Sequence, residues 1–325
     1  MSDSNKIYLF DAYSLIYRAF YAFIRNPLYS SKGLNTSAVL GFTNSLLEIW
    51  DKENPTHIAV AFDPQTPTFR HEIFPEYKAN RQKMPEDIQK AIPYIKAIIE
   101  AFHIPILQQD GYEADDIIGT LATQAEKAGY TTYMVTPDKD YTQLVDEQTF
   151  VYKPKKTGNE LEILGVQEVC EKYGIENPRQ VIDILALWGD SSDNIPGAPG
   201  VGEVTAKKLI GKYKSVEGIY EHINELKGKQ KEKLINYKDQ VMLSKDLVTI
   251  ALDAPVKWSW EELKGGEPDM AELKKLFEEL EFKTLIKRFF GESAKGPVPK
   301  QGSLFPDDSG QASADVSHET LPSAF

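Results

Sequence analysis

Acidic residues follow four short apolar stretches of this sequence, each at the point where a β-strand would end. Asp11 and Asp63 directly follow the first two stretches, Glu113 begins a helical pattern after the third, and Asp138 follows the fourth. Each acid alone is explained by the preference of aspartate and glutamate for turns and first helical turns. Together they would bring carboxylates from four strands to one edge of a parallel sheet, where α/β proteins build their sites.

The acids of this edge form an oxygen-only set of side chains, and a further pair lies in the loop 188–197. The nine acids are Asp11, Asp63, Glu113, Asp115, Asp116, Asp138, Asp140, Asp190 and Asp193. Two like charges about 4 Å apart repel by roughly 4 kcal/mol at an effective dielectric constant near 20, so such a cluster needs cations. Oxygen ligands without histidine or cysteine favour Mg²⁺ or Mn²⁺ over zinc, and the set predicts a two-metal phosphoryl-transfer site.

Short apolar stretches that alternate with helical patterns must position these acids. We expect strands at 7–10, 57–62, 104–107 and 131–136, and helices near 13–24, 37–52, 86–102 and 114–128. Near-continuous apolar strands between helices are typical of a mostly parallel sheet that is covered on both faces.

The pattern changes near residue 178 to helices joined by Gly/Pro turns, with one β-like stretch at 248–252. We therefore expect a catalytic α/β domain over 1–177 and a helical region over 178–290. Residues 291–325 are rich in Ser, Pro, Gly and Ala and lack periodicity, which predicts a disordered linker or tail.

The composition of the 325 residues is that of a globular protein with a net charge of −12 and a single cysteine, Cys170. One cysteine excludes an intrachain disulfide and a cysteine-based zinc site, which suits the cytoplasm. No apolar stretch approaches the length of a membrane span. We expect a monomer without membrane contact, whose negative charge disfavours a phosphate-rich partner unless the acids cluster in one place.

Residues 64–85, the arch segment, start directly after Asp63 and interleave basic with aromatic side chains. The basic ones are Arg70, Lys78, Arg81 and Lys83, and the aromatic ones Phe69, Phe74 and Tyr77. Cations meet phosphates and rings stack on bases, so the pattern favours a nucleic-acid strand over the acidic edge. The alternative is a mobile loop with ordinary surface charge.

A second basic stretch surrounds the glycine-rich turn Gly200-Val201-Gly202. Glycines let backbone amides approach a phosphate, and the N-terminus of the following helix favours an anion. Lys207 and Lys208 follow within two turns, and 196–235 holds eight Lys against five Glu, a local charge of +3. The alternative is a glycine-rich connection between two helices.

Five motifs of this sequence closely resemble those of a known family. They are DAYSLIYRAFYAF, FPEYKANRQKMP, EADDIIGTLA, TPDKDYTQLV and GDSSDNIPGAPGVGEVTAKKLI, in order over residues 6–290. The family is the 5′-nuclease domain at the N-terminus of bacterial DNA polymerase I, the bacterial branch of the flap endonuclease (5′-3′ exonuclease) superfamily.

The resemblance implies a PIN-like α/β fold, a helical arch and a helix–three-turn–helix module of the helix-hairpin-helix type that binds DNA. It implies Mg²⁺-dependent hydrolysis of 5′ flaps and of 5′ ends in nicked or gapped duplexes, for primer removal and repair. It also implies two metal clusters: Asp11, Asp63, Glu113 and Asp115 in the first, Asp138, Asp140 and Asp193 in the second, with Asp116 and Asp190 behind them.

The resemblance further implies DNA contacts. Arg70, Lys78 and Arg81 resemble residues that grip the scissile phosphate. Tyr77 resembles an aromatic residue that contacts the substrate, and Arg18 resembles an arginine that contacts a phosphate. Gly200, Val201 and Gly202 resemble a turn that binds duplex phosphates and that holds K⁺ in some relatives.

Two residues depart from the family pattern. Ala12 and Pro137 stand where glycines are usual. Neither departure removes a ligand, so both bear only on the local backbone. A PIN-type ribonuclease would share the acids but has no reason to carry the arch segment and the glycine turn. A catalytically silent DNA-binding module is the other alternative, and the complete set of acids argues against it.

The last part of the chain contains QGSLF, residues 301–305. Gln301, Leu304 and Phe305 fit the pattern of peptides that resemble bacterial sliding-clamp ligands, and an unremarkable linker is the alternative. The sequence fits a standalone nuclease and the N-terminal part of a DNA polymerase I equally well.

Overall fold

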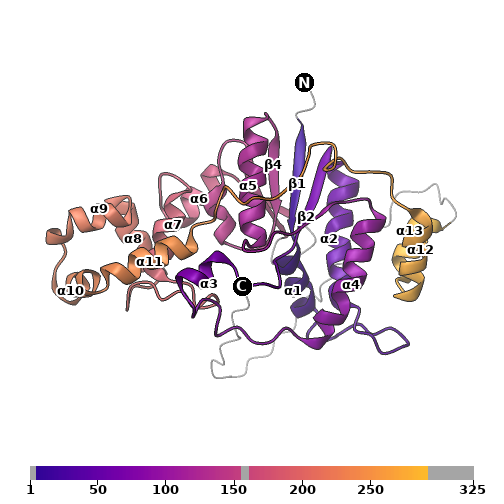
Figure 1. The fold of residues 1–325 in the computed structure, drawn as a ribbon, viewed down its shortest axis with the longest axis horizontal. Coiled ribbons are helices and arrows are strands. Elements are labelled where there is room, and N and C mark those ends of the chain that lie inside the picture. Colours follow the sequence, from indigo (N-terminus) through magenta and orange to yellow (C-terminus); the bar gives the residue numbers. More distant parts are fainter. Residues whose placement is uncertain (1–4, 155–160, 292–325) are drawn as a thin grey trace, which may run out of the picture.

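The chain folds around a six-stranded sheet with helices on both faces (Figure 1). This computed structural model describes residues 5–154 and 161–291. The strand order is β3-β2-β1-β4-β5-β6, and all neighbours pair in parallel except β5 and β6. The strands are β1 (Lys6–Asp11), β2 (His57–Ala61), β3 (Ile106–Leu107), β4 (Thr131–Val135), β5 (Thr149–Pro154) and β6 (Leu161–Leu164).

The four strands expected from the sequence are confirmed as β1 to β4, and the mostly parallel sheet with them. β3 is shorter than expected because only Val60 and Ala61 of β2 pair with it. β5 and β6 are an addition that the sequence did not predict. β5 reads TFVYKP, with polar residues near its ends, and is fixed by parallel pairing with β4.

Alternate side chains of the strands enter two separate cores, as the two-residue period of a strand requires. Ile7 and Leu9 of β1 join one core, and Tyr8 and Phe10 join the other. The first core includes helix α5 (Ala114–Lys127). The second includes the helices α1 (Ala12–Ala22), α2 (Ser37–Glu53) and α4 (Glu86–Ala101).

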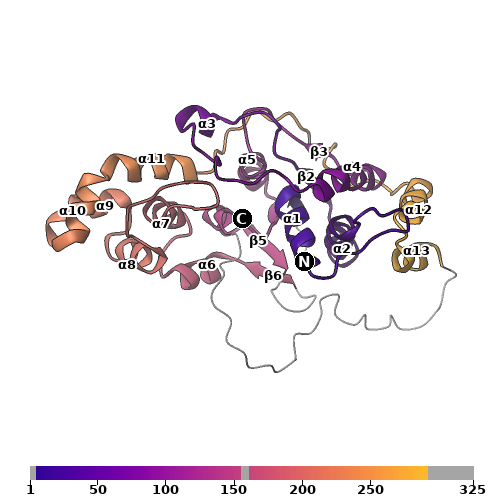
Figure 2. The ribbon, with the colours of Figure 1, turned by 90° about the horizontal axis from the view of Figure 1, so that it is seen from below.

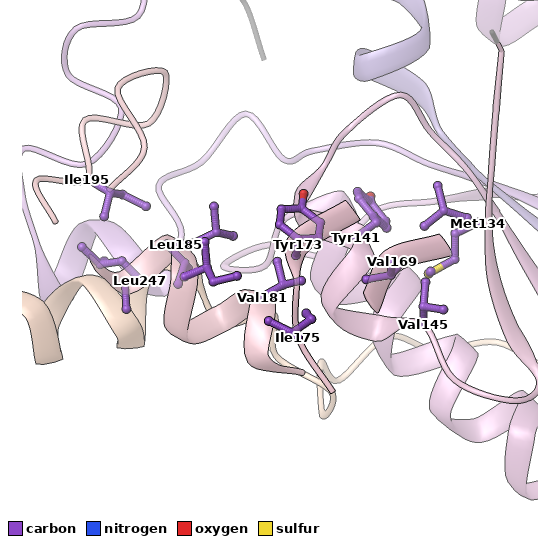
Figure 3. Packing of buried hydrophobic residues seen from close by; sticks show 14 of the residues in the cluster. Met134, Tyr141, Val145, Val169, Tyr173, Ile175, Val181, Leu185, Ile195 and Leu247 are labelled. Carbon is purple, nitrogen blue, oxygen red and sulfur yellow. The ribbon is translucent and has the colours of Figure 1, made fainter. Parts of the chain in front are cut away.

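A row of helices continues from the sheet on the side of α5 (Figure 1). These helices are α6 (Val166–Tyr173), α7 (Gln180–Trp188), α8 (Glu203–Tyr213), α9 (Val216–Glu221), α10 (Gly228–Asn236) and α11 (Lys238–Val248). Their apolar faces extend the first core, which runs without interruption from Met134 of β4 through Val181 to Leu247 of α11 (Figure 3). The sheet and the helical row are therefore packed together by one set of buried side chains.

The last two described helices return to the sheet. α12 (Met270–Glu279) and α13 (Lys283–Phe290) place Leu273, Phe277 and Leu285 in the second core. They lie at the opposite end of the molecule from α8, α9 and α10 (Figure 2). No helix in 5–154 or 161–291 is long and apolar enough to cross a membrane.

The β-like stretch expected at 248–252 is not a strand. α11 ends at Val248, and the residues after it pair with no strand of the sheet. Their backbone groups are instead bonded to buried side chains: Gln143 bonds the backbone of Val248 and Ile250, and Asp116 accepts from Ala251 N. An extended chain needs partners for its amides and carbonyls, and here side chains supply them.

The arch segment contains one short helix, α3 (Phe69–Ile73), followed by turns over 75–80. Lys78 adopts a φ of +57° within these turns, a conformation uncommon for residues other than glycine. Lys78 N donates to Asp193 O at 2.9 Å, which fastens the segment to the loop 188–197.

Candidate active site at the carboxyl edge of the sheet

An open cavity of about 870 Å³ lies at the carboxyl ends of the strands, between the sheet edge and the arch segment. Eight of the nine predicted acids line it, and Asp116 does not. The lining acids are Asp11, Asp63, Glu113, Asp115, Asp138, Asp140, Asp190 and Asp193. The sequence prediction that these side chains converge on one edge is therefore confirmed for the eight.

Asp11 is the N-cap residue of α1 and the end of β1. Its carboxylate accepts from Ser14 N at 3.2 Å, Ser14 Oγ at 2.7 Å and Thr136 Oγ1 at 3.1 Å. Burial and the nearby charge of Asp63 raise the pKa of Asp11 to about 7. The capping role and the cavity position thus coexist in one side chain.

Asp63 follows β2 and accepts from Ala114 N at 2.7 Å, at the first turn of α5. Burial raises its pKa against the opposing charge of Lys78. Asp115, in the same first turn, also has its pKa raised well above the usual range by burial and by the charge of Asp116. The two acids are held beside each other because the end of a strand meets the start of a helix.

Asp138 and Asp140 follow β4 and are both lining residues of the cavity. Asp138 Oδ1 accepts from Asp140 N at 3.0 Å. Burial raises the pKa of Asp138, and burial together with the Asp138 charge raises that of Asp140 well above its usual range. Asp140 Oδ1 and Tyr141 Oη are buried without a hydrogen-bond partner among the described residues, and Lys139 Nζ lies 3.5 Å from Asp140 Oδ1.

Basic side chains of the protein contact the acids of the cavity. The pairs are Lys78–Glu113 at 2.7 Å, Lys78–Asp193 at 3.8 Å, Arg81–Asp193 and Lys139–Asp190. Burial would raise the pKa values of Glu113 and Asp193, but these cations hold both below their usual range. Within the described ranges no three His, Cys, Asp or Glu side chains are grouped closely enough to hold a metal ion.

Arg70 and Asp116 form an ion pair away from the cavity surface. Arg70 is 1% exposed and Asp116 0%, and two guanidinium nitrogens donate to the two carboxylate oxygens at 2.7 and 2.8 Å. Asp116 also accepts from Glu113 N at 2.9 Å, as the N3 residue of a capping box. This burial does not fit the phosphate contact expected of Arg70. It does fit the position behind the metal ligands that the resemblance implies for Asp116.

Tyr77 is also buried, with 3% of its surface exposed. Its hydroxyl donates to Glu113 Oε2 at 3.0 Å and to Asp193 Oδ2 at 3.1 Å. A ring enclosed in the core cannot stack on a base, so the expected aromatic contact with substrate does not fit this position. Arg18 lies on α1, is half-buried, and has its pKa lowered by that burial.

The turn Gly200-Val201-Gly202 precedes α8 in the helical row. Gly200 has a φ of +79°, and Gly202 is the N-cap residue of α8. A Cβ at Gly200 would lie 2.5 Å from Lys233 Nζ of α10, a basic neighbour that the sequence did not single out. The missing side chain at Gly200 therefore leaves room for the ammonium group of Lys233.

The two lysines after this turn face different surroundings. Lys207 pairs with Glu203 at 2.6 Å and donates to Lys172 O at 3.1 Å. Lys208 lines a smaller cavity between α8 and α10. Gln301, Leu304 and Phe305 lie outside the described residues, and so does all but Gly291 of the expected linker.

Sequence reasoning missed several residues of the cavity. Tyr13, Tyr17, Lys96 and Tyr141 line it. Lys139 was visible between Asp138 and Asp140, but only the fold shows that its ammonium reaches across to Asp190.

Comparison with known proteins identifies the family. The model of the "5′-3′ exonuclease, N-terminal resolvase-like domain" matches residues 6–174, and that of the "5′-3′ exonuclease, C-terminal SAM fold" matches 176–271. DNA polymerase I of Bacillus subtilis is 43% identical over all of this chain, which covers 37% of that protein. DNA polymerase I of Caldicellulosiruptor bescii is 42% identical over 87% of the chain and 33% of its own length. The chain thus spans about a third of the length of these relatives.

Solved structures share the fold at low identity. The T5 D15 protein co-crystallised with metal ions matches 86% of this chain and 98% of its own, with 18% identity and a TM-score of 0.60. A T5 D15 flap endonuclease complex with DNA and metal ions matches 75% of this chain and 88% of its own, with 19% identity and a TM-score of 0.61. The catalytic core of Rad2 in complex with a DNA substrate matches 88% of this chain and 91% of its own, with 16% identity and a TM-score of 0.57. With both domain models matched and curated relatives above 40% identity, the chain belongs to the 5′-3′ exonuclease family.

Proposed function

We propose that this chain is a structure-specific 5′-nuclease that hydrolyses phosphodiester bonds of 5′-flapped, nicked or gapped DNA with two divalent cations. The observation that carries the proposal is the convergence of eight carboxylates on one open cavity at the sheet edge. Family membership supports the same reaction class, and relatives of the same fold are described with metal ions and with DNA.

The donor set fits hard divalent cations. It offers carboxylate oxygens only, several with raised pKa values because they are buried near one another. Asp140 Oδ1 is buried without a hydrogen-bond partner in the described part of the chain, as an oxygen reserved for a cation would be. We assign Asp11, Asp63, Glu113 and Asp115 to one Mg²⁺ or Mn²⁺ and Asp138, Asp140 and Asp193 to the other, with Asp190 behind them.

When bound, the two cations supply an activated water and stabilise the leaving oxygen of an in-line displacement. Lys78 and Arg81 neutralise charge that develops on the phosphoryl oxygens. In the structure these two groups contact Glu113 and Asp193, and they would exchange those contacts for the phosphoryl oxygens of a bound substrate. Hydrogen bonds from Ser14 and Thr136 hold the Asp11 carboxylate in the orientation in which it would bind a cation.

Arg70, Tyr77 and Asp116 act behind this set. Tyr77 Oη orients Glu113 and Asp193 together, and Asp116 fixes the backbone of Glu113. Arg70 neutralises Asp116 in the core and thereby keeps α5 in place. Their contribution to catalysis is the position of the ligands, without contact to the phosphate.

The helical row binds the duplex through the turn at Gly200, Val201 and Gly202 and through Lys207 and Lys208. Backbone amides at the start of α8 meet phosphates, and the two lysines add positive charge. The proposal includes a K⁺ at this turn, which must share the space beside Gly200 with Lys233. Duplex affinity measured at equal ionic strength in KCl and in LiCl tests for it.

The 43% sequence identity to a DNA polymerase I extends over the whole chain. It supports the proposal that this chain is the N-terminal nuclease part of such a protein and acts in primer removal and repair in the cytoplasm. We further propose that Gln301, Leu304 and Phe305 bind a bacterial sliding clamp. A clamp pull-down tests this, and retention of binding by the double variant Leu304→Ala, Phe305→Ala would exclude it.

Cleavage of a flapped DNA duplex compared with single-stranded RNA of the same sequence tests the proposed function. A 5′-nuclease of this kind cleaves the flap near its junction and leaves the RNA intact. Preferential cleavage of the RNA would point to a PIN-type ribonuclease. Tight DNA binding with no cleavage in Mg²⁺ or Mn²⁺ would point to a DNA-binding module.

A further inference from the structure

Residues 247–251, the connector, comprise the last two residues of α11 and the three that follow it. Their backbone groups are bonded to buried side chains that lie behind the acids of the cavity. Arg70 Nε donates to Leu247 O at 2.9 Å, and Arg70 Nη2 donates to Thr249 O at 3.1 Å. The last carbonyls of a helix have no partner within it and carry partial negative charge, so a buried guanidinium is a strong cap for α11.

Two further side chains hold the same connector. Gln143 Nε2 donates to Val248 O and Gln143 Oε1 accepts from Ile250 N, both at 3.0 Å. Asp116 Oδ1 accepts from Ala251 N at 2.8 Å. Gln143 is 3% exposed and lies in the 3₁₀ helix η1 (Asp140–Leu144), which also begins with an acid of the cavity. The connector is thus bonded to elements that carry both proposed groups of metal ligands.

The other part of α11 holds the start of the loop that leads to the DNA-binding turn. Gln240 Nε2 donates to Gly197 O at 2.6 Å, and Ser244 Oγ accepts from Gly197 N at 3.1 Å. A Cβ at Gly197 would lie 2.4 Å from Gly189 N, so the backbone at this point is closely packed. Ser244 is fully buried, which makes the contact part of the core.

α11 therefore joins two places that the proposed function keeps separate. The stretch of α11 between its bonded residues Gln240 and Leu247 spans about 10 Å at 1.5 Å per residue. Figure 1 shows it running from α10 toward the sheet. We propose that α11 is a strut that fixes the distance from the duplex-binding turn to the cavity, and thereby sets which phosphate reaches the cations.

The inference rests on the proposed function and assigns Gln143 and Arg70 as positioning residues. Neither lines the cavity, so neither touches the reacting phosphate. Their hydrogen bonds hold the C-terminal end of the strut. With one end released, the duplex remains bound by the turn, but its phosphates are no longer held at one position relative to the carboxylates.

The test is single-nucleotide mapping of products from a 5′-labelled flap duplex, together with kcat and KM in Mg²⁺, for wild type and for Gln143→Met. Methionine keeps the length of the side chain and removes both hydrogen bonds. We expect a dominant product in wild type and cleavage spread over neighbouring phosphodiesters in the variant. We expect kcat to fall about tenfold, equivalent to ~1.4 kcal/mol of barrier, with KM within about twofold.

Gln180→Met is the matched control, because Gln180 also bonds backbone groups, at Lys214 O and Glu176 N, and both of these partners lie outside α11 and the connector. It should keep the single dominant product and the wild-type kcat. Arg70→Lys, which keeps the positive charge but cannot reach both connector carbonyls, decides the matter if Gln143→Met does not fold.

The outcomes separate the inference from the function beneath it. A wild-type chain without cleavage refutes the proposed function. An active wild type with an unchanged product pattern and kcat in Gln143→Met, or in Arg70→Lys where the former does not fold, refutes the strut. An equal change in Gln180→Met also refutes it, because the effect would then be general destabilisation.

Discussion

Lys78 Nζ lies 2.7 Å from Glu113 Oε1 and 3.8 Å from Asp193 Oδ2, so one lysine of the arch segment bridges acids from α5 and from the loop 188–197. Burial would lower the pKa of Lys78, but the charges of these two acids hold it above the usual range. Under the proposed function, a cation fixed at this point would meet a phosphoryl oxygen of the substrate.

Replacement of Lys78 should therefore affect rate more than affinity. We expect Lys78→Met to lower kcat by about 100-fold, the usual loss for a charge-stabilising donor, with DNA affinity within about threefold. Lys274→Met, at an exposed position of α12 that does not line the cavity, is the control and should change little. Equal losses in rate and affinity for Lys78→Met would mean that the lysine only binds DNA.

Loss of one carboxylate charge should abolish cleavage and spare DNA binding. We expect this of Asp138→Asn and of Asp11→Asn, measured by flap cleavage and by fluorescence anisotropy with labelled duplex. Asparagine retains the N-cap of α1 at position 11. Asp269→Asn is the control, since Asp269 caps α12 in the same way far from the cavity. Near-normal cleavage by either variant would contradict the metal assignment.

Removal of Arg70 should destabilise the fold. Arg70→Met leaves Asp116 charged and buried without its cation, which costs about 3–5 kcal/mol of unfolding free energy. The double variant Arg70→Met, Asp116→Leu should recover a substantial part of that loss, because it also removes the buried carboxylate that the single variant leaves without its cation. Urea unfolding of the single and double variants measures both. A single variant as stable as wild type would show that the pair is dispensable.

The raised pKa values predict proton release when metal binds. Asp11 has a pKa of about 7 in the metal-free fold, above that of an unfolded aspartate, so the folded state holds more protons between about pH 4 and 7. The raised pKa of Asp11 therefore makes the folding stability of the metal-free protein fall as the pH rises through this window. Metal must displace those protons, so affinity should rise with pH.

Calorimetric titration with Mn²⁺ measures the proton release directly. The observed heat at pH 6.5 should differ between two buffers of different ionisation enthalpy, and Asp11→Asn should reduce the difference. Heats that are identical in both buffers would contradict the raised pKa values.

The parallel part of the sheet could be predicted from the sequence because its first four strands are short apolar stretches that alternate with helical patterns. An acid follows each of them at a different spacing, from Asp11 at the end of β1 to Glu113 six residues after β3. The shared cavity followed from the parallel order of those strands. Tyr77 could not be placed in the same way. An aromatic residue among cations reads as a nucleic-acid contact, and only tertiary packing shows that its ring is enclosed and its hydroxyl reaches Glu113 and Asp193.

The positions and hydrogen bonds of Arg70 and Gln143 could not be predicted from the sequence for a related reason. Both bond to residues more than 100 positions away, at Leu247 and Val248. The apolar, β-branched stretch at 248–252 has the composition of a strand, and local pattern cannot tell whether strands or side chains satisfy its backbone.

The most direct test of the account is cleavage of a 5′-labelled flap duplex by the metal-free chain before and after addition of Mg²⁺. The account predicts no product with EDTA, and with Mg²⁺ cleavage near the flap junction that leaves a 5′-phosphate on the downstream duplex. Cleavage that persists in EDTA, or no cleavage at millimolar Mg²⁺ or Mn²⁺ by a chain that binds the duplex, would contradict it.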